Sequence, residues 1–480
     1  MDVGIISCGA YVPTLRLERK VAAAAWARNP VAGERSVANN DEDSLTMAVE
    51  AGRNCLRDAQ VQQKELGGLF FATTTAPYAE KMSAALVSTV LDMRRELITI
   101  DFAQSLRAGT GALRMAIDTV RSGSAANILV AAADSRNAYP KSDQEQEFGD
   151  GGATVLVGGG KGNLIATFEG GYTLCNEMMD VWRNPEDRYI KTWENRFIIG
   201  EGYAKQTIQA LTGLMRKLNL KKEDIRKVII PSPDSRSYTQ VAQKLGFDPK
   251  TQVQNPLMTQ VGFCGAAQPL LLLVSALEEA KPGDLILLAA YGDGADALLF
   301  RATERISEPV KRATLKRLLE EKMMISSYSR FLSYKGILEA LPGEPFRLIP
   351  SATATWREQD SLLRLHGGRC KDCGHAVYPI QRICEKCYSK DKYEKVPMAD
   401  SKGEIFSFTR DYLAGRSDDP IICQTVVDLE NGIRFYGLMT DCDPERVDVG
   451  MPIELTFRRI YEGAGFHNYY WKCRPARKEN

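Results

Sequence analysis

The sequence predicts a layered α/β body over residues 1–304, followed by smaller β-rich domains. Short apolar or β-branched runs alternate with helical patterns as far as about Glu304. Such alternation is typical of sheets packed between layers of helices. Beyond residue 304 the periodicity changes, and four of the cysteines fall close together in the chain.

The body contains the following expected elements. Strands are expected at Val3–Cys8, Leu69–Thr73, Ile98–Phe102, Ile128–Ala133, Thr154–Val157, Val228–Ile230 and Leu285–Ala290. Helices are expected at Ser44–Ala59, Leu106–Val120, Tyr203–Leu218 and Pro269–Glu279. Asp41 and Asp43 can cap the first of these helices. The Lys281-Pro282-Gly283-Asp284 run ends the last helix and leads into the following strand.

The C-terminal third divides into three parts. Residues 305–361 are predicted to be a helical linker, because KRATLKRLLEEK is a charged helical pattern and LPGEPFRLIP is punctuated by proline. Residues 362–400 hold the cysteine cluster. Residues 401–480 contain alternating runs with a hairpin turn at Glu430-Asn431-Gly432, which favours a small β-barrel of the oligonucleotide/oligosaccharide-binding (OB) type.

Composition excludes several classes of protein. Lys and Arg total 62 against 61 for Asp and Glu, a formal charge of +1, so we expect no nucleic-acid partner. The apolar runs Leu270–Val274 and Leu285–Ala290 are too short to cross a bilayer, and the start of the chain does not resemble a signal peptide. We therefore expect a cytoplasmic protein without membrane contact.

The cysteine cluster predicts a structural zinc site. Cys370, Cys373, Cys384 and Cys387 form two C-x-x-C pairs separated by ten residues. Four thiolates at this spacing give zinc a closed tetrahedral site with no open position for a substrate. His375 follows the first pair closely and is expected to lie at the surface or behind the ligands rather than to bind the metal.

Several motifs carry a family resemblance. They are GIISCGAYVP at the N-terminus, TTTAPYAEK at 73–81, RAGTGAL at 107–113, FGDGGATVLVGG at 148–159, DVWR at 180–183, RFIIGEGY at 196–203 and AKPGDLILLAAYGDGADALLF at 280–300. Together they resemble 3-hydroxy-3-methylglutaryl-CoA synthases of the thiolase superfamily. The run from Leu362 to Thr409 resembles the zinc-ribbon/OB proteins that accompany acyl-CoA enzymes of that superfamily.

The resemblance implies a five-layered thiolase fold, α/β/α/β/α, made of two similar halves at about 1–160 and 161–304. It also implies a homodimer that acts on a coenzyme A thioester. In this family a Glu, a Cys, a His and an Asn carry the reaction. Their positions fall here on Thr74, Leu106, Pro231 and Phe263, so none of the four residues is present.

Other side chains are candidates for the lost chemistry. Ser105 stands at the start of the same helix as Leu106, where it serves either as a nucleophile or as a helix cap. Cys264 is either a relocated thiol or a buried, inert one. Tyr78, Tyr203 and Tyr291 lie in segments that line the family's pocket, where a phenol can donate a proton or simply fill the core.

Two arginines match basic residues near the family's CoA entrance. Arg183 and Arg196 suit phosphates by bidentate hydrogen bonding, and the alternative is a surface ion pair with acids such as Glu186, Asp187 or Glu194.

Three functions remain open. The first is aldol-type formation or cleavage of a carbon–carbon bond in an acyl-CoA, without an acyl-cysteine intermediate. The second is a Claisen-type acyltransferase with a displaced nucleophile, Cys264 or Ser105. The third is a non-catalytic subunit that binds or channels acyl-CoA beside a partner thiolase or another enzyme of its pathway. Pro379-Ile380 and Arg382, between the two cysteine pairs, are expected to contact the α/β body.

Overall fold

The computed structural model describes residues 2–59, 61–160, 162–338, 349–416 and 419–477. The chain divides into two compact units: Met1–Ser88 with Met93–Leu338, and Thr89–Asp92 with Glu339–Glu479. Most of the predicted LPGEPFRLIP linker lies outside the described residues.

The first unit is built on one continuous mixed sheet in the order β11-β12-β13-β8-β1-β7-β6-β4-β5. Its strands are β1 (Val3–Tyr11), β4 (Gly68–Ala72), β5 (Ile98–Phe102), β6 (Asn127–Asp134), β7 (Gly151–Gly159), β8 (Ala166–Cys175), β11 (Lys227–Ile229), β12 (Leu285–Tyr291) and β13 (Gly294–Ala302). All seven predicted strands are present. The sequence patterns did not indicate β8 or β13.

The strand order shows two similar halves. In the first half β1, β7 and β6 run antiparallel in turn, and β6, β4 and β5 are parallel. In the second half β8, β13 and β12 run antiparallel, and β12 and β11 are parallel. A parallel bridge between Val228 and Val253 stands where β5 stands in the first half. Pairing of β1 with β8 joins the halves.

Helices complete the layers. Helix α2 (Ser44–Arg57) packs on β1, β6 and β7, and α7 (Lys205–Lys217) packs on β8, β12 and β13. Helices α4 (Ala108–Arg121) and α9 (Gln268–Glu279) pack against each other and against both halves of the sheet. Their apolar side chains form the main hydrophobic core, in which Leu270–Val274 is fully buried. This arrangement matches the predicted α/β/α/β/α layering.

Smaller elements surround these layers. They are α1 (Arg19–Ala25), β2 (Leu15–Glu18), β3 (Glu34–Val37), η1 (Gln63–Glu65), α3 (Ser83–Val90), α5 (Asp143–Glu147), β9 (Val181–Trp182), β10 (Lys191–Thr192), α6 (Asn195–Phe197), the π-helix η2 (Ile198–Ala204), η3 (Lys222–Asp224), α8 (Ser237–Leu245), η4 (Gly265–Ala267) and η5 (Glu304–Ser307).

The residues directly after 304 pack in the first unit and do not form a linker. Helix α10 (Leu315–Glu320) buries Leu315 and Leu318 in the main core, and β14 (Met323–Met324) pairs with β2. Helix α11 (Tyr328–Tyr334) buries Phe331 against β2 and β3 residues. The packed body therefore extends past the predicted boundary at 304, because these short helices bury apolar side chains in the clusters of the first unit. Among the described residues, no helix is long and apolar enough to cross a membrane.

The second unit holds α12 (Ala352–Arg357), α13 (Gln359–Leu362), a small three-stranded sheet and a five-stranded sheet. The small sheet contains β15 (His366–Cys370), β16 (Ala376–Val377) and β17 (Tyr393–Pro397). The larger sheet contains β18 (Lys402–Asp411), β19 (Ile422–Leu429), β20 (Arg434–Leu438), β21 (Pro452–Gly463) and β22 (Phe466–Pro475), with η6 (Pro444–Arg446) before β21. A bridge from Met439 to Cys473 links its two edges into a small barrel. The predicted turn joins β19 and β20, with Gly432 at φ +84°.

The four predicted cysteines converge in the small sheet. Their Sγ atoms all lie within 4.8 Å of one another, with Cys370 to Cys387 at 3.7 Å and Cys373 to Cys384 at 3.6 Å. Zinc–sulfur bonds of about 2.3 Å in a tetrahedron place sulfur atoms about 3.8 Å apart, so the geometry fits zinc. His375 is outside this set, and its Nε2 lies 2.6 Å from Glu385 Oε1.

The two cysteine knuckles have the same backbone hydrogen bonds. The N–H of Gly374 donates to Cys370 O, and the N–H of Tyr388 donates to Cys384 O. Both Gly374 and Tyr388 have positive φ, as the tight turn requires. On the predicted contact segment, Arg382 pairs with Asp391 at 2.9 Å and Ile380 is 39% exposed.

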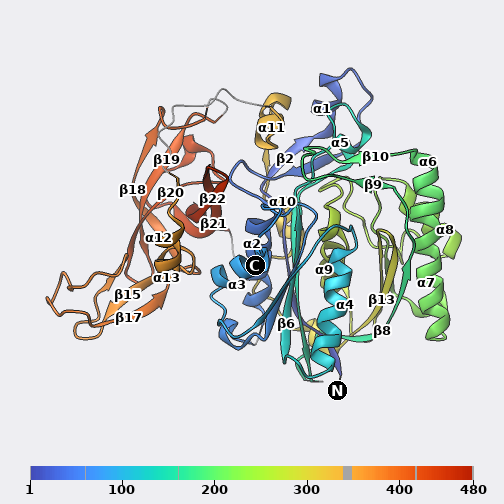
Figure 1. Cartoon of the computed structure of the whole chain (residues 1–480), viewed down its shortest axis with the longest axis horizontal. Coiled ribbons are helices and arrows are strands. Elements are labelled where there is room, and N and C mark those ends of the chain that lie inside the picture. Colours follow the sequence, from blue (N-terminus) through green and yellow to red (C-terminus); the bar gives the residue numbers. More distant parts are fainter. Residues whose placement is uncertain (1, 60, 161, 339–348, 417–418, 478–480) are drawn as a thin grey trace. The chain divides into compact units, whose positions relative to one another are not determined.

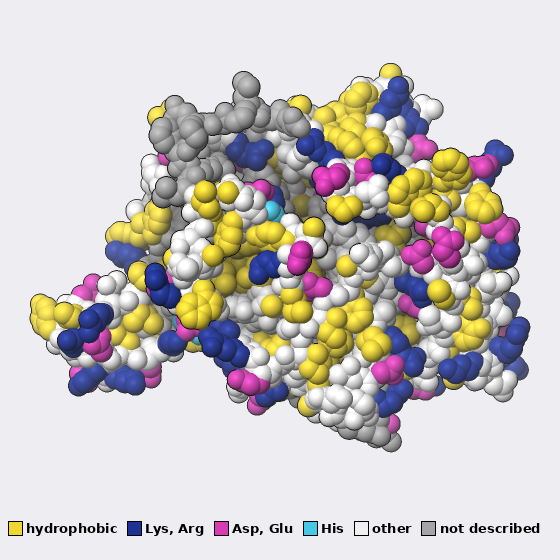
Figure 2. All heavy atoms as spheres, viewed as in Figure 1, with side chains coloured by type: hydrophobic (Ala, Val, Ile, Leu, Met, Phe, Trp, Pro, Cys, Tyr) yellow, Lys and Arg dark blue, Asp and Glu magenta, His cyan; other side chains and the backbone are white. Residues whose placement is uncertain are grey.

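Charge on the surface follows the balanced composition. Figure 2 shows Lys and Arg interspersed with Asp and Glu over the visible face, without a continuous region of one sign.

Replacing one ligand tests the zinc site. Cys373→Ser is expected to lower bound zinc from one ion per chain to near zero, because structural zinc needs all four ligands and its binding stabilises the ribbon directly. Zinc content by mass spectrometry and proteolysis within 362–400 are the measurements. Cys175→Ser, at an exposed cysteine outside the cluster, should keep its zinc. Full zinc content in Cys373→Ser would contradict the assignment.

Candidate active site

Asp134, at the end of β6, organises the region where the family's reacting groups are expected. The Asp134 carboxylate is fully buried. It accepts hydrogen bonds from the Thr73, Thr74 and Thr75 hydroxyls at 2.8–2.9 Å, and from the Thr74 N–H at 2.7 Å. It also accepts from the Ala266 N–H at 2.7 Å. Asp134 therefore holds the loop after β4 against the start of α9, and Thr74 serves as one of its donors.

Apolar side chains occupy the three other positions to which the resemblance assigns the family's reacting residues. Leu106 and Phe263 pack in one cluster with Phe148 and Met258. Pro231 is buried directly after β11. The side chains at these positions offer neither a nucleophile nor a hydrogen-bond donor, so any chemistry must use other groups nearby.

Cys264 lies just before η4 and α9, where its thiol is completely buried. Burial raises the pKa of Cys264, and the nearby charge of Asp150 adds to the effect. The Gln268 side-chain oxygen accepts from the Cys264 N–H at 2.8 Å. A protonated and enclosed thiol is a poor nucleophile.

Ser105 precedes α4. Its hydroxyl accepts a long hydrogen bond from the Arg107 N–H, at 3.4 Å, and lies 3.4 Å from Gly292 O. It also lies near the carboxyl of Asp293, where it lowers the pKa of that carboxyl. The first unit contains no histidine, so within that unit Ser105 has a carboxylate neighbour but no imidazole base.

A phenol and two carboxyl groups lie beside the start of α4. Tyr291 ends β12, and its hydroxyl donates to Asp180 Oδ2 at 2.6 Å. Asp293 follows two residues later, and its backbone oxygen accepts from the Arg107 side chain at 3.1 Å. Burial raises the pKa of Asp293, and the charge of Asp180 raises it further. Burial also raises the pKa of Tyr291, which keeps its proton available for donation.

The π-helix η2 allows Tyr291 to approach. A Cβ on Gly202 would lie 2.4 Å from the Tyr291 hydroxyl, so only glycine fits there. Tyr203, the next residue, packs edge-on against the Tyr291 ring with centroids 5.8 Å apart. A π-helical turn often marks a functional position in a helix. Tyr78, in contrast, is half-buried in the segment after β4.

The two predicted CoA-binding arginines are both exposed. Arg183 donates to Thr74 O at 3.0 Å and to Asp187 O at 3.3 Å, which places its guanidinium beside the Asp134 loop. Arg196 lies on α6, next to Phe197.

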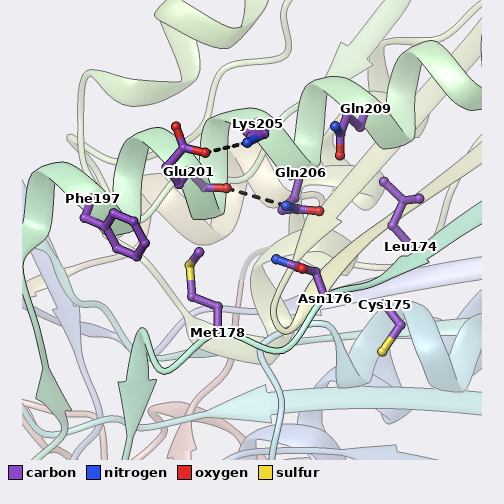
Figure 3. A pocket seen from close by; sticks show the side chains of 9 residues that line it. All are labelled: Leu174, Cys175, Asn176, Met178, Phe197, Glu201, Lys205, Gln206 and Gln209. Carbon is purple, nitrogen blue, oxygen red and sulfur yellow. Dashed lines mark hydrogen bonds and ion pairs between the residues drawn. The ribbon is translucent and has the colours of Figure 1, made fainter.

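Phe197 lines a pocket of 440 Å³ between the end of β8 and the η2–α7 helix (Figure 3). The residues around it are Leu174, Cys175, Asn176, Met178, Phe197, Glu201, Lys205, Gln206 and Gln209. Glu201 and Lys205 pair at 2.5 Å on its helical wall. On the opposite wall Met178 has its sulfur 3.8 Å from the Tyr291 hydroxyl. Met178 thus separates the pocket from the Tyr291–Asp180 pair.

Sequence reasoning did not single out Asp180 and Asp293. Both stand in motifs that carry the family resemblance, DVWR and YGDG. Their convergence depends on the β9 segment and the β12–β13 turn meeting in space, and spacing along the chain does not show this.

Comparison with known proteins agrees with this architecture. The model of the C-terminal part of 3-oxoacyl-[acyl-carrier-protein] synthase III matches residues 215–301. The rubredoxin-like zinc ribbon and C-terminal OB-fold domains of ChsH2 match residues 362–393 and 395–458.

Solved structures show the same fold. MvaS in complex with 3-hydroxy-3-methylglutaryl coenzyme A superposes with a TM-score of 0.63 at 20% identity, covering 73% of this chain and 94% of that one. The 3-oxoacyl-[acyl-carrier-protein] synthase III of Aquifex aeolicus has a TM-score of 0.56 at 23% identity, covering 62% of this chain and 99% of that one.

Curated relatives are more similar in sequence. The hydroxymethylglutaryl-CoA synthase of Methanopyrus kandleri is 32% identical over 343 residues, which is 69% of this chain and 97% of that protein. The synthase of Thermococcus sibiricus is 34% identical over 302 residues, 62% of this chain and 85% of that protein. The chain therefore belongs to the hydroxymethylglutaryl-CoA synthase family of the thiolase superfamily and carries a zinc ribbon and an OB-fold domain in its C-terminal part.

Proposed function

We propose that this protein forms or cleaves a carbon–carbon bond of a CoA thioester by aldol-type chemistry, without an acyl-cysteine intermediate. The observation that carries the proposal is the group formed by Tyr291, Asp180 and Asp293 beside the start of α4. Thr74, Leu106, Pro231 and Phe263 occupy the positions of the family's Glu, Cys, His and Asn. The CoA thioester is inferred from the family relatives.

Aldol chemistry requires only groups that move protons and stabilise an oxyanion. In the cleavage direction a carboxylate takes the proton of a β-hydroxyl, and the bond between Cα and Cβ breaks. The products are a carbonyl compound and a thioester enolate, which receives a proton at Cα. Asp293, with its raised pKa, is the proposed base, and Tyr291, oriented by Asp180, is the proposed proton donor. The proton that Asp293 takes from the β-hydroxyl then returns to the Tyr291 phenolate, so the protein ends the cycle unchanged. The reverse sequence forms the bond.

The proposed route for the thioester passes along the pocket beside Met178. Arg196 lies next to the pocket-lining Phe197, and Arg183 lies at the Thr74 loop. Both guanidinium groups are exposed and suit CoA phosphates. The Glu201–Lys205 pair on the pocket wall adds charged groups near the same entrance.

A specific observation supports one alternative, a non-catalytic acyl-CoA-binding subunit. Leu106 and Phe263 fill two reacting positions with packed apolar side chains. The displaced-nucleophile alternative has less support, because Cys264 is buried with a raised pKa and Ser105 lacks a histidine partner within the first unit.

Substitution of Tyr291 distinguishes these functions. Tyr291→Phe is expected to slow exchange of the α-protons of acetyl-CoA or propionyl-CoA with deuterated water by about 10²- to 10³-fold, because it removes the proton-donating hydroxyl. Nuclear magnetic resonance follows the exchange. Tyr203→Phe is the matched control and should change the rate less than about threefold.

The double variant Cys264→Ala/Ser105→Ala should keep the exchange of α-protons. Loss of exchange in this variant would favour the Claisen-type mechanism. A wild-type protein that binds these thioesters without exchanging their protons would favour the non-catalytic subunit.

The pH dependence of exchange tests Asp293. The base must be ionised, so the rate should fall as pH drops through the pKa of Asp293. Because that pKa is raised, the fall should occur at higher pH than for an ordinary aspartate, which titrates at about 3.9. Asp293→Asn should lower the rate and remove this limb of the profile. Asp248→Asn, at an exposed aspartate whose pKa is lowered, is the control and should leave the profile unchanged. An identical acid limb in Asp293→Asn would exclude Asp293 as the base.

We also propose that the protein is a homodimer joined at β5. This strand is the last one of the large sheet in the described residues, and Ile100 on it is 39% exposed. Met82, with its sulfur 3.1 Å from the Thr99 hydroxyl, adds exposed apolar surface beside the strand. A sheet edge of this kind pairs readily with the same edge of a second copy.

Ile100→Lys is expected to convert the dimer into a monomer, because the charge would be buried without a partner at the interface. Light scattering of the full chain measures the mass. Met324→Lys changes a methionine on β14 that is about as exposed as Met82, and this variant should remain dimeric. A monomeric wild-type protein, or a dimeric Ile100→Lys variant, would exclude this interface.

A further inference from the structure

Arg136, two residues beyond β6, is a buried cation without a hydrogen-bond partner. Its side chain is only 3% exposed, and its Nε is buried with no partner among the described residues. Burial lowers the pKa of Arg136 to about 10, so the group is still protonated at neutral pH. A buried charge without a hydrogen-bonded partner is costly, and each such group in a folded protein needs an explanation.

Other buried arginines in the first unit each donate at least one hydrogen bond to the protein, although some of their nitrogens, such as Nε and Nη2 of Arg35, also lack a partner among the described residues. Arg312 donates to Cys8 O at 2.7 Å and pairs with Glu278 at 3.0 Å. Arg35 donates to Glu145 O at 2.6 Å. Arg136 differs from both, because its close neighbours are two aromatic rings. Its guanidinium carbon lies 4.5 Å from the centroid of Phe148 and 5.7 Å from that of Phe263.

The nearby carboxylates are already engaged. Asp134 is the acid with the largest effect on Arg136, but its two oxygens accept the hydrogen bonds from Thr73, Thr74, Thr75 and Ala266 described above. A carboxylate has about four acceptor sites, so Asp134 has none left for a guanidinium. Asp180 accepts from Tyr291 and from the Val181 N–H. The second cation in this region, Arg183, opposes the charge of Arg136 and partly offsets the effect of the two carboxylates.

The position of Arg136 indicates which part of a ligand it meets. Phe263, beside the guanidinium, packs with Leu106, and these two residues occupy positions of the family's reacting groups. The arginine stem passes Gly265 at the start of η4, where a Cβ would lie 2.7 Å from Arg136 Cδ. Arg136 is therefore placed for the acyl end of a bound thioester, whereas the exposed Arg183 and Arg196 are placed for its phosphates.

We propose that Arg136 binds a carboxylate on the acyl group of the substrate, so that the protein selects carboxyacyl-CoA thioesters over their uncharged counterparts. A guanidinium can hold a carboxylate by two parallel hydrogen bonds. A permanent cation is matched best by a permanent anion, whereas an enolate exists only during the reaction. This inference rests on the proposed function and adds the chemical class of the acyl group.

Calorimetry on the full chain tests the proposal with matched pairs of thioesters. The pairs are malonyl-CoA with propionyl-CoA, succinyl-CoA with butyryl-CoA, and glutaryl-CoA with pentanoyl-CoA, each differing in one terminal carboxylate. Wild-type protein is expected to bind the carboxylated member of at least one pair about 10-fold or more tightly. Arg136→Gln should abolish that preference and change the affinity for the uncharged member less than about threefold. Arg136→Lys should keep part of the preference, because it retains the charge without the planar fork.

Arg183→Gln is the comparison variant. It removes a cation proposed to meet the phosphates, so it should weaken both members of a pair equally. The thermal midpoint of Arg136→Gln should stay close to that of the wild type, because the substitution removes a costly buried charge together with its contacts to the rings of Phe148 and Phe263. A lower midpoint together with an unchanged preference would show a purely structural role and overturn the proposal.

Other outcomes also overturn it. Equal binding of both members of every pair by the wild type would exclude a carboxylate site while leaving the proposed function intact. Loss of α-proton exchange in Arg136→Gln, with the preference unchanged, would assign the guanidinium to the enolate instead. Failure of the wild type to bind any CoA thioester would overturn both this inference and the proposed function.

Discussion

The candidate site depends on the hydrogen bonds that the buried carboxylate of Asp134 accepts. Its hydrogen bonds reach the loop after β4 and the first turn at α9, two segments that are far apart in the chain. A charged group in a low-dielectric interior is stable only when its acceptor sites are filled, and here the protein fills them from both segments. The same saturation leaves Arg136 without an acid partner. One carboxylate thereby fixes the loops and makes the neighbouring cation available.

The candidate site differs in composition from the site of the family, within an unchanged architecture. The layers, the two halves and the central helices α4 and α9 are those of the family, but Leu106 and Phe263 now pack against each other. The polar groups Tyr291, Asp180 and Asp293 lie together beside the residues before α4. Because aldol chemistry needs proton transfer and oxyanion stabilisation but no nucleophile, these groups are chemically sufficient for the proposed reaction. Cys264, in contrast, belongs to a reactive residue type, but burial raises the pKa of its thiol and keeps it protonated.

The strands β12 and β8 show why one strand was predicted and another was not. The strand β12 is a run of buried aliphatic residues, and its pattern alone predicts a buried strand. The strand β8 reads ATFEGGYTLC, with two glycines and several half-exposed residues, so it lacks that pattern. Its pairing with β13 and β1 stabilises it instead. The segment after residue 304 was predicted as a linker because charge dominates its composition, although Leu315 and Leu318 belong to the main core.

The sequence by itself determined the α/β layering, the OB-type barrel and the zinc site, because each depends on local periodicity or on the spacing of one residue type. The C-x-x-C pairs place four thiolates together through turns that the adjacent residues make. The motifs also determined the family, and with it the loss of the reacting residues at Thr74, Leu106, Pro231 and Phe263. Only the tertiary structure decided which polar groups lie near these positions. Asp180 meets Tyr291, and Arg136 lies between Phe148 and Phe263, through contacts between segments that are distant in the chain. The energy of a buried charge depends on such contacts rather than on the residues next to it in the sequence.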